Sequence, residues 1–434
     1  MGEKKNTKEI LVKKEDKKSF DELIEASIEQ TKKTQLVRDL KELEGPHSIT
    51  DLVALIVKKA WESSASDIHI DPQPSSVLIR YRIDGVLHDV LSLKKELHPL
   101  IISRIKVLAG LRTDEHFMAQ DGRFKVIEGT NEIDLRVSII PTYHEENVVM
   151  RLLVGEARAL DLIELGFSAR DLDILQRYIK KPYGMILATG PTGSGKTSTL
   201  YSILKILNSR NVSIVTIEDP IEYSVAGVTQ IQVNTQTNLT FAAGLRSIVR
   251  QDPNIIMVGE IRDEETSGIA INAAMTGHLL LSTIHTNDAA TTLPRLLDMG
   301  AEPFLIASTV NIAIGQRLVR RLCEKCRSQY TLTREETASL SAVIPNELLK
   351  KYKSFWKENG CSACNNTGYT KRSGIFEVLE VTEPIRRLIM RRANADEIRV
   401  AAKQGGMTTM LEDGFNKAVA GVTSIAEILR VIRD

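Results

Sequence analysis

A glycine-rich loop followed by Lys and Thr is the stretch of this sequence with the clearest chemistry. Four residues separate Gly190 from Gly195, and Lys196 and Thr197 follow directly. This spacing fits a pattern in which the backbone N–H groups of a loop surround phosphate oxygens. Lys196 can reach the β- and γ-phosphates, and the Thr197 hydroxyl can bind Mg²⁺. The sequence therefore predicts a site for a nucleoside triphosphate and Mg²⁺, formed by Gly190, Pro191, Thr192, Gly193, Ser194, Gly195, Lys196, Thr197 and Ser198.

The residues on either side of the loop predict the elements that position it. Residues 185–188 form a short apolar run typical of a buried strand, and residues 198–204 have apolar positions that suit a helix packed on a sheet. A strand, a glycine loop and a helix in this order are the context that the phosphate-binding pattern requires.

Three further apolar runs each end in a residue that can do chemistry. Residues 214–217 precede Glu218, residues 255–258 lead to Glu260, and residues 279–284 precede His285. Continuous runs of this kind are typical of parallel strands that are buried on both faces. Because ligands of open α/β sheets lie beyond the carboxyl ends of the strands, all three side chains are expected near the phosphates.

Phosphoryl transfer to water needs a positioned water and a metal ion on the phosphate oxygens. We predict that Glu260 activates the water, because it follows a buried strand as the acidic residues of a Walker-B motif do. Gly259 occupies the position of the usual Asp, so Glu218 is expected to hold Mg²⁺, directly or through water, with help from Asp219 or Glu222. Which of the two strand-end glutamates activates water stays open at this stage.

His278 and His285 flank one predicted strand and are seven residues apart, which places them on opposite faces. One is expected to sense the γ-phosphate or orient Glu260. The other is expected at an interface or in a structural role. Four arginines are equally compatible with a solvent-exposed helix face and with an interface role: Arg246, Arg250, Arg262 and Arg317.

A mixed α+β domain is predicted upstream of the loop. A helix is expected from Ile49 with Thr50 as its N-cap, followed by alternating strands. Asp84-Gly85 between two such strands is a strong signal for a two-residue hairpin. The domain is rich in arginines, most of them expected on strand faces and a few available to a neighbouring subunit's nucleotide: Arg80, Arg82, Arg104, Arg123, Arg136 and Arg151.

All four cysteines fall in two C-x-x-C pairs, Cys323/Cys326 and Cys361/Cys364, with 34 residues between the pairs. The spacing predicts a tetra-cysteine Zn²⁺ site with an inserted helical segment. A closed site of four sulfurs leaves no open coordination position, so its predicted role is folding and not catalysis.

Composition limits the class of protein. The chain has 434 residues, 42% hydrophobic and 26% charged, with a net charge of +1, so it has no bulk attraction for nucleic acid. It lacks an apolar run long enough to cross a bilayer and an apolar N-terminal signal, which predicts a soluble, cytoplasmic protein. The predicted segments are a disordered tail (1–18), a helical segment and linker (19–47), the α+β domain (48–154), the nucleotide domain (155–322), the tetra-cysteine module (323–371) and a C-terminal part with helical periodicity from Ile375 (372–434).

Together, four stretches resemble the ATPases of type II secretion and type IV pilus assembly. They are residues 190–197, the acidic box 217–222, the box 255–263 and residues 276–286. Three upstream stretches, 66–69, 80–85 and 120–123, are similar to the second N-terminal domain of that family. The resemblance covers residues 48 to 434.

The resemblance implies an α/β fold, with a RecA-like P-loop core and a PAS-like α+β domain before it. It further implies a homohexamer at the cytoplasmic face of the inner membrane that hydrolyses ATP and drives fibre assembly through a membrane platform protein. Arg123 and Arg136 would reach the nucleotide as the upstream domain closes. The cysteine module is typical of assembly ATPases and not of retraction motors. A membrane-anchored protein would recruit the chain, usually through a longer N-terminal domain than the segment here.

Two alternatives remain beside the secretion motor. A nucleic-acid motor with a DNA-binding zinc ribbon is disfavoured by the near-zero net charge and by an aromatic content of 5%, because strand-tracking channels use basic grooves and stacking aromatic rings. The second alternative is a nucleotide-gated scaffold that does not hydrolyse ATP. It would differ from the motor by a near-zero rate of ATP turnover.

Overall fold

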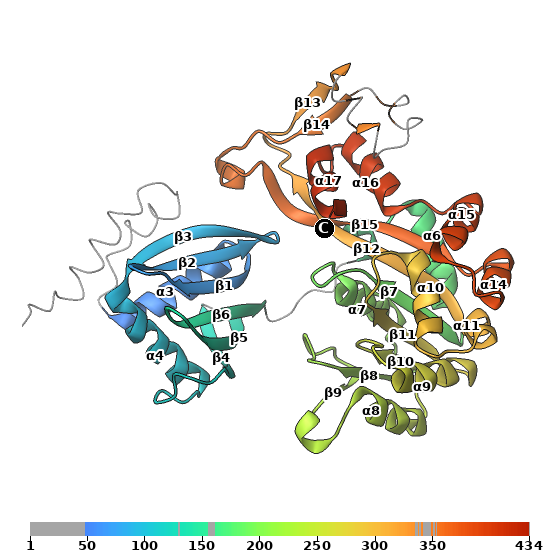
Figure 1. Ribbon diagram of the computed structural model, residues 1–434, viewed down its shortest axis with the longest axis horizontal. Helices are drawn as coiled ribbons and strands as arrows, with labels where there is room; N and C mark the ends of the chain where they lie inside the picture. The colour runs from blue at the N-terminus through green and yellow to red at the C-terminus, as the bar shows by residue number, and fades with distance from the viewer. Residues whose placement is uncertain are drawn as a thin grey trace, which may run out of the picture. The chain divides into compact units, whose positions relative to one another are not determined.

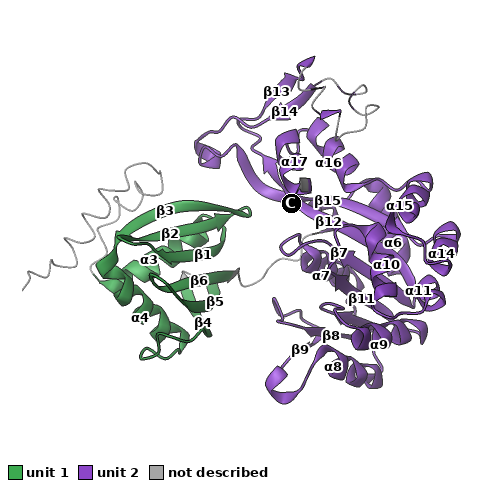
Figure 2. Cartoon of the chain, in the orientation of Figure 1, with its two compact units in different colours: residues 1–155 green, residues 156–434 purple. Residues whose placement is uncertain are grey.

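The computed structural model describes residues 48–128, 131–154, 161–334 and 354–433, with isolated positions between 337 and 352. The chain divides into two compact units, Met1–Gly155 and Glu156–Asp434 (Figure 2). The predicted tail (1–18) and helical segment (19–47) lie outside the described residues.

The first unit is built on a six-stranded antiparallel sheet in the order β3-β2-β1-β6-β5-β4. Apolar side chains of two helices and of the strands form one core, with Ile56, Ile70 and Ile105 among its fully buried members. The elements are α3 (Ile49–Glu62), β1 (Ala65–Pro72), β2 (Ser76–Ile83), β3 (Val86–Lys94), α4 (His98–Ala109), β4 (Gln120–Glu128), β5 (Asn131–Thr142) and β6 (Glu145–Val154).

Local chemistry accounts for the predicted hairpin and helix of this unit. Asp84 and Gly85 join β2 to β3 with φ angles of 49° and 86°, the left-handed pair that a two-residue hairpin turn needs. Helix α3 begins at Ile49 as expected, but Thr50 is not its N-cap. Ser48 takes that role, because its hydroxyl accepts the Asp51 N–H at 3.2 Å.

The second unit contains a seven-stranded sheet in the order β15-β12-β7-β11-β10-β8-β9. Neighbouring strands are parallel except β15, which runs antiparallel to β12. All four strands predicted from apolar runs are present and fully buried. The strands are β7 (Gly184–Thr189), β8 (Ile214–Glu218), β9 (Thr229–Gln232), β10 (Ile255–Val258), β11 (Leu279–Ile284), β12 (Val310–Leu322) and β15 (Tyr369–Glu380).

Helices cover both faces of this sheet (Figure 1). One face packs against α5 (Leu162–Leu165), α6 (Ala169–Ile179) and α7 (Lys196–Leu207). The opposite face packs against α8 (Phe241–Ile248), α9 (Glu264–Met275), α10 (Ala289–Asp298), α11 (Pro303–Thr309), α14 (Glu383–Met390) and α15 (Ala395–Gln404). No helix among the described residues is long and apolar enough to cross a membrane.

The helical pattern expected from Ile375 onward is wrong for its first residues. β15 extends to Glu380 and pairs with β12 inside the main sheet, and the first helix of this part begins at Glu383. Residues 374–379 are buried without interruption, which is the environment of a strand covered on both faces. The last helices, α16 (Met410–Val419) and α17 (Ile425–Arg433), pack on β15 and β12 respectively.

A buried ion pair attaches α17 to β12. The Glu427 side chain has no exposed surface, and its carboxylate accepts hydrogen bonds from the Arg320 guanidinium at 2.8 and 3.1 Å. Arg430 donates to the same carboxylate at 2.7 and 2.9 Å. Although burial opposes ionisation, the hydrogen bonds from Arg430 and Arg320 outweigh it and lower the pKa of Glu427.

We predict that Glu427→Ala destabilises the second unit by about 3–5 kcal/mol, because it leaves Arg320 without its buried partner. Since the folded pKa is lowered, the wild-type contribution is present at neutral pH and is lost as the pH falls through that pKa. Urea unfolding of the two proteins at neutral and acidic pH measures both effects.

Glu383 provides the matched control, because it also contacts two arginines, Arg386 and Arg387, but is exposed. Glu383→Ala should cost less than about 1 kcal/mol. Equal losses for the two glutamates would contradict a special role for the buried pair.

Candidate functional site

The glycine loop connects β7 to α7 at the carboxyl edge of the parallel sheet. Gly190, Gly193 and Gly195 have φ angles of 144°, 79° and 90°, which residues with side chains rarely adopt. Gly195 is the N-cap of α7, so the first backbone N–H groups of the helix lie next to the loop. Pro191, Thr192, Gly193 and Ser198 are exposed, Gly195 and Thr197 are half-buried, and Gly190, Ser194 and Lys196 are buried.

The side chain of Lys196 folds back onto the glycine loop that precedes it. Its ammonium donates to the carbonyl oxygens of Gly190 at 2.8 Å and of Pro191 at 3.0 Å. Burial lowers the pKa of Lys196, and the negative charge of Glu260 opposes that shift. The loop and the Glu260 carboxylate therefore belong to one electrostatic site.

The structure brings Glu260 and His285 together from the ends of neighbouring strands, β10 and β11. The His285 Nε2 atom lies 2.9 Å from one carboxylate oxygen of Glu260, and Arg262 forms an ion pair with the other oxygen. The Glu260 side chain is about 10% exposed, whereas that of His285 is about half exposed. A carboxylate held from both sides in this way suits a group that orients a water.

Glu218 lies in a separate cluster at the end of β8. One of its oxygens accepts a short hydrogen bond from the Tyr201 hydroxyl. The other accepts from Thr216 at 2.6 Å and from Gln230 at 3.2 Å. All three donors are neutral, and Glu218 is 2% exposed. An Mg²⁺ contact through water would be compatible with this arrangement of donors.

Gly259 takes the strand-end position where the Walker-B pattern has Asp, and the structure gives a packing reason. A Cβ atom on Gly259 would lie 3.3 Å from the Glu218 Cα and 3.4 Å from the Ile217 carbonyl oxygen. The Gly259 N–H also donates to that carbonyl at 2.7 Å. The close approach of β10 to β8 therefore favours glycine here.

Of the histidines and arginines predicted near the site, Arg262 contacts Glu260 as described above. The others, His278, Arg246, Arg250 and Arg317, have different partners. His278 Nδ1 lies 2.8 Å from the Ala273 carbonyl at the end of α9, which favours the structural role. Arg246 pairs with Glu265 on the surface. Arg250 donates to the Arg246 carbonyl at 2.8 Å, and the buried Arg317 donates to the Val431 carbonyl at 2.9 Å.

Arg123 and Arg136 are cross-strand partners on β4 and β5 of the first unit. They are therefore neighbours in one sheet. Their contact with nucleotide stays a prediction. Three other arginines of this unit pair with acidic side chains: Arg80 with Asp71, and Arg82 and Arg151 with Asp67.

The four cysteines form one cluster in which all sulfur atoms lie within 4.8 Å of one another. The Sγ–Sγ distances are 3.9 Å for Cys323–Cys361, 3.8 Å for Cys326–Cys364 and 3.7 Å for Cys361–Cys364. A tetrahedral Zn²⁺ with Zn–S bonds of about 2.3 Å places its sulfurs about 3.8 Å apart. The cluster therefore has the dimensions of a tetrathiolate zinc site.

Backbone groups at Cys364 favour the thiolate form that a metal needs, whereas burial and hydrogen bonds with the other cysteines raise the pKa of Cys326 to about 11. Although burial raises the pKa of a thiol, N–H donors from Cys361 and Gly368 bring the pKa of Cys364 down to about 7. The ends of the predicted helical insertion form a two-stranded sheet, β13 (Ser328–Thr331) with β14 (Ser354–Lys357), and most of its middle lies outside the described residues.

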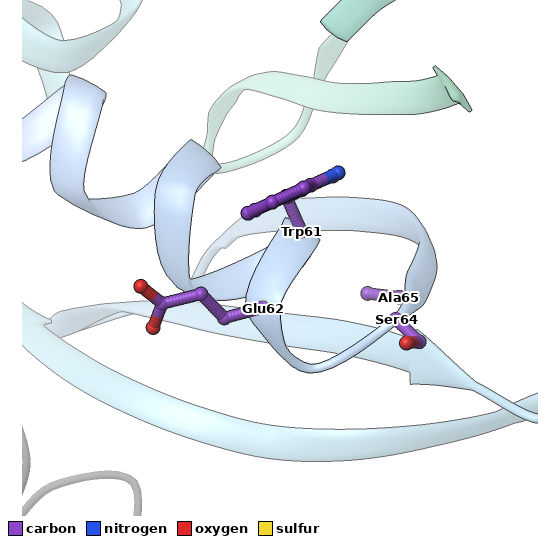
Figure 3. A pocket seen from close by; sticks show the side chains of 4 residues that line it. All are labelled: Trp61, Glu62, Ser64 and Ala65. Atoms are coloured by element: carbon purple, nitrogen blue, oxygen red, sulfur yellow. The ribbon is translucent and has the colours of Figure 1, made fainter. Parts of the chain in front are cut away.

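A cavity in the first unit does not belong to the nucleotide site. It has a volume of about 460 Å³ and is lined by Trp61, Glu62, Ser64 and Ala65. Figure 3 shows the Glu62 carboxylate pointing away from the Ser64 hydroxyl. The two polar side chains among the described lining residues, Glu62 and Ser64, therefore do not converge on a common point.

The residues around the predicted carboxylate Glu218 and beside His285 were not predicted from the sequence. Tyr201 and Gln230 donate hydrogen bonds to the Glu218 carboxylate. In the loop after His285, the Thr286 carbonyl accepts a hydrogen bond from the Thr189 hydroxyl. A tyrosine inside the apolar run 200–204 was the available signal, because a buried hydroxyl needs a partner. Gln230, on an exposed edge strand, gave no such signal.

We predict that the purified chain contains about one zinc per molecule and that Cys323→Ser/Cys361→Ser contains none. Metal analysis measures the content, and a thiol reagent gives a second readout. Because the chain has only these four cysteines, every thiol released by a chelator comes from the cluster. Four freely reactive thiols in the untreated protein would rule out a closed metal site.

Comparisons with known proteins agree with this geometry. Residues 42–430 match the family described as Type II/IV secretion system protein. The chain is 45% identical over 398 residues to the type II secretion system protein HxcR of Pseudomonas aeruginosa, covering 92% of this chain and 80% of the relative. It is 42% identical over 404 residues to the type IV pilus assembly ATPase PilB of Myxococcus xanthus, covering 93% and 71%.

Solved structures support the same assignment. The crystal structure of the pilus retraction motor PilT with bound ADP matches with a TM-score of 0.58 and 25% identity, over 86% of this chain and 95% of that one. The Legionella pneumophila ATPase DotB matches with a TM-score of 0.64 at 20% identity, over 87% and 94%, which supports the fold alone. With the nucleotide loop, the strand-end carboxylates and the cysteine cluster in place, this chain belongs to the type II/IV secretion system protein family and is an ATPase of that family.

Proposed function

We propose that this chain is an ATP-hydrolysing motor that powers the assembly of a pilus or pseudopilus, and with it protein secretion. The observation that carries the proposal is the Glu260 carboxylate, held between His285 and Arg262 and acting on Lys196 of the nucleotide loop. The names of the relatives, type II secretion proteins and a pilus assembly ATPase, support the mechanical task. They favour it over a nucleic-acid motor.

In this mechanism the loop N–H groups and Lys196 bind the triphosphate of ATP. Glu260 orients a water for attack on the γ-phosphate and accepts its proton. His285 and Arg262 keep the carboxylate in place. Residues suited to hold Mg²⁺ are Thr197, through its hydroxyl, and Glu218, through water; the ion would neutralise charge on the β- and γ-oxygens.

We further propose that the active form is a ring of six copies. Arg123 and Arg136 would then supply positive charge to a nucleotide, from the chain's own first unit or from a neighbour. Arginines offered in this way stabilise the charge that develops during phosphoryl transfer. Turnover would therefore depend on assembly.

The proposed place of action is the cytoplasmic face of the inner membrane. No helix among the described residues qualifies as a membrane span. A platform protein in the membrane would receive the mechanical work, and a membrane-anchored protein would recruit the chain.

Lys196→Ala should abolish nucleotide binding and hydrolysis, because it removes the cation of the loop. Glu260→Gln should keep nucleotide binding but lower the hydrolysis rate by about 10²–10⁴-fold, the usual contribution of a general base. Calorimetry with ADP and Mg²⁺ measures binding, and a steady-state phosphate assay measures turnover.

Glu218→Gln is the comparison variant for this pair. If Glu218 supports the metal, the Mg²⁺ concentration for half-maximal turnover should rise by at least about tenfold. A Glu260→Gln protein that hydrolyses ATP at the wild-type rate would refute the assigned base. Near-zero turnover in both wild type and Glu260→Gln would favour the non-hydrolysing scaffold.

Subunit mixing tests the composite site. Lys196→Ala subunits keep both arginines, and Arg123→Ala/Arg136→Ala subunits keep the loop. If the arginines act across subunits, the mixture should regain turnover that neither variant has alone, as measured by phosphate release at constant total protein. A mixture that stays inactive would indicate that the arginines act on the nucleotide of their own subunit. A fully active Arg123→Ala/Arg136→Ala variant would show that turnover does not need them.

A further inference from the structure

A buried glutamine lies directly against the nucleotide loop. Gln316 on β12 is 1% exposed and has no role in the mechanism above. Its Nε2 atom donates to the Ser194 carbonyl at 2.8 Å, and its Oε1 atom accepts from the Thr199 hydroxyl at 2.8 Å. One amide thus joins the loop before Lys196 to the first turns of α7 after it.

The chemistry of the two partners fixes the orientation of this amide. A backbone carbonyl can only accept, so the NH₂ group must face Ser194. The Thr199 hydroxyl can donate, so it satisfies the amide oxygen. Because both bonds are buried, the loss of either would leave a buried polar group without a partner, which is unfavourable.

Two of the loop glycines are in close contact with Gln316. A Cβ atom on Gly190 would lie 2.4 Å from the backbone carbonyl oxygen of Gln316. A Cβ atom on Gly195 would lie 3.1 Å from the side-chain Nε2 atom of Gln316. These are the two glycines that the phosphate-binding pattern fixes. The loop is therefore folded over Gln316, and the glycines permit that approach.

The strand that carries Gln316 is held on both sides. β12 pairs with β7 up to Gly315 and Thr189, directly before the loop, and with β15 along most of its length. Further along β12, Arg320 is bound by the buried Glu427. A group on a strand fixed in this way positions its partners better than a group on a loop.

We propose that Gln316 is a positioning residue that sets the shape of the nucleotide loop before nucleotide binds. A preformed loop reduces the ordering that binding must supply, so its loss weakens affinity more than the chemical step. The proposal deepens the proposed function and rests on nucleotide binding at this loop, which Lys196→Ala tests separately.

Gln316→Met keeps the side-chain length and removes both hydrogen bonds. We expect the dissociation constant for ADP with Mg²⁺ to rise by about tenfold or more, because the Ser194 carbonyl loses its donor. The KM for ATP should rise with it, while kcat at saturating ATP stays within about threefold. Calorimetry and steady-state kinetics on the full chain measure the split, and thermal unfolding confirms the fold.

Asn311→Ala is the matched control. Asn311 is also a buried amide on β12 with two partners, donating to the Tyr183 carbonyl at 3.1 Å and accepting from Lys181 at 3.3 Å, but at the end of β7 opposite the loop. Its nucleotide affinity should stay within about twofold of wild type, since only the strand is disturbed.

Two outcomes would overturn the proposal: unchanged affinity in Gln316→Met, or an equal loss in Asn311→Ala, which would indicate a general effect of the strand. If Gln316→Met does not fold, Gln316→Asn carries the same expectation, because its amide is one methylene too short to reach both partners. If Lys196→Ala binds nucleotide as tightly as the wild type, the assignment of the nucleotide site to this loop would instead be wrong.

Discussion

Burial of the parallel strands on both faces is the constraint on which the rest of this structure depends. Strands β12, β7, β11, β10, β8 and β9 run the same way, so their carboxyl ends meet at one edge. Groups that bind ligands gather where such strands end, whereas polar side chains within the strands, such as Gln316, need buried hydrogen-bond partners. The glycine loop, Glu218, Glu260 and His285 all lie at that edge because each ends or follows one of these strands.

At this edge the structure gives two glutamates different surroundings. Glu260 contacts the groups that can carry positive charge, His285 and Arg262, and lies close enough to Lys196 to act on its pKa. The donors that contact Glu218 among the described residues, Tyr201, Thr216 and Gln230, are all neutral. Environments that differ in this way allow two carboxylates in one site to take different roles. This contrast supports the proposal that Glu260 orients the water and Glu218 supports the metal.

Strand β12 links three parts of the second unit. Gln316 contacts the nucleotide loop, Arg320 binds Glu427 of α17, and Cys323 follows directly after the strand in the cysteine cluster. Arg320 also lies over the Tyr369 ring at 4.1 Å, close to the start of β15. One rigid strand therefore connects the nucleotide loop with the C-terminal helices and the cysteines, although the sequence analysis assigned it no element.

Contiguous patterns determined what the sequence alone could establish. The loop Gly190–Thr197, the apolar runs before Glu218, Glu260 and His285, the Asp84-Gly85 turn and the spacing of the cysteines each depend on neighbours in the chain. Pairing between distant segments decided the rest. Residues 374–379 form a strand because β12 lies beside them, and Gln316 and Tyr201 gain roles only through Ser194 and Glu218. Periodicity records which face of an element is buried, but the partner that buries it is set by tertiary packing.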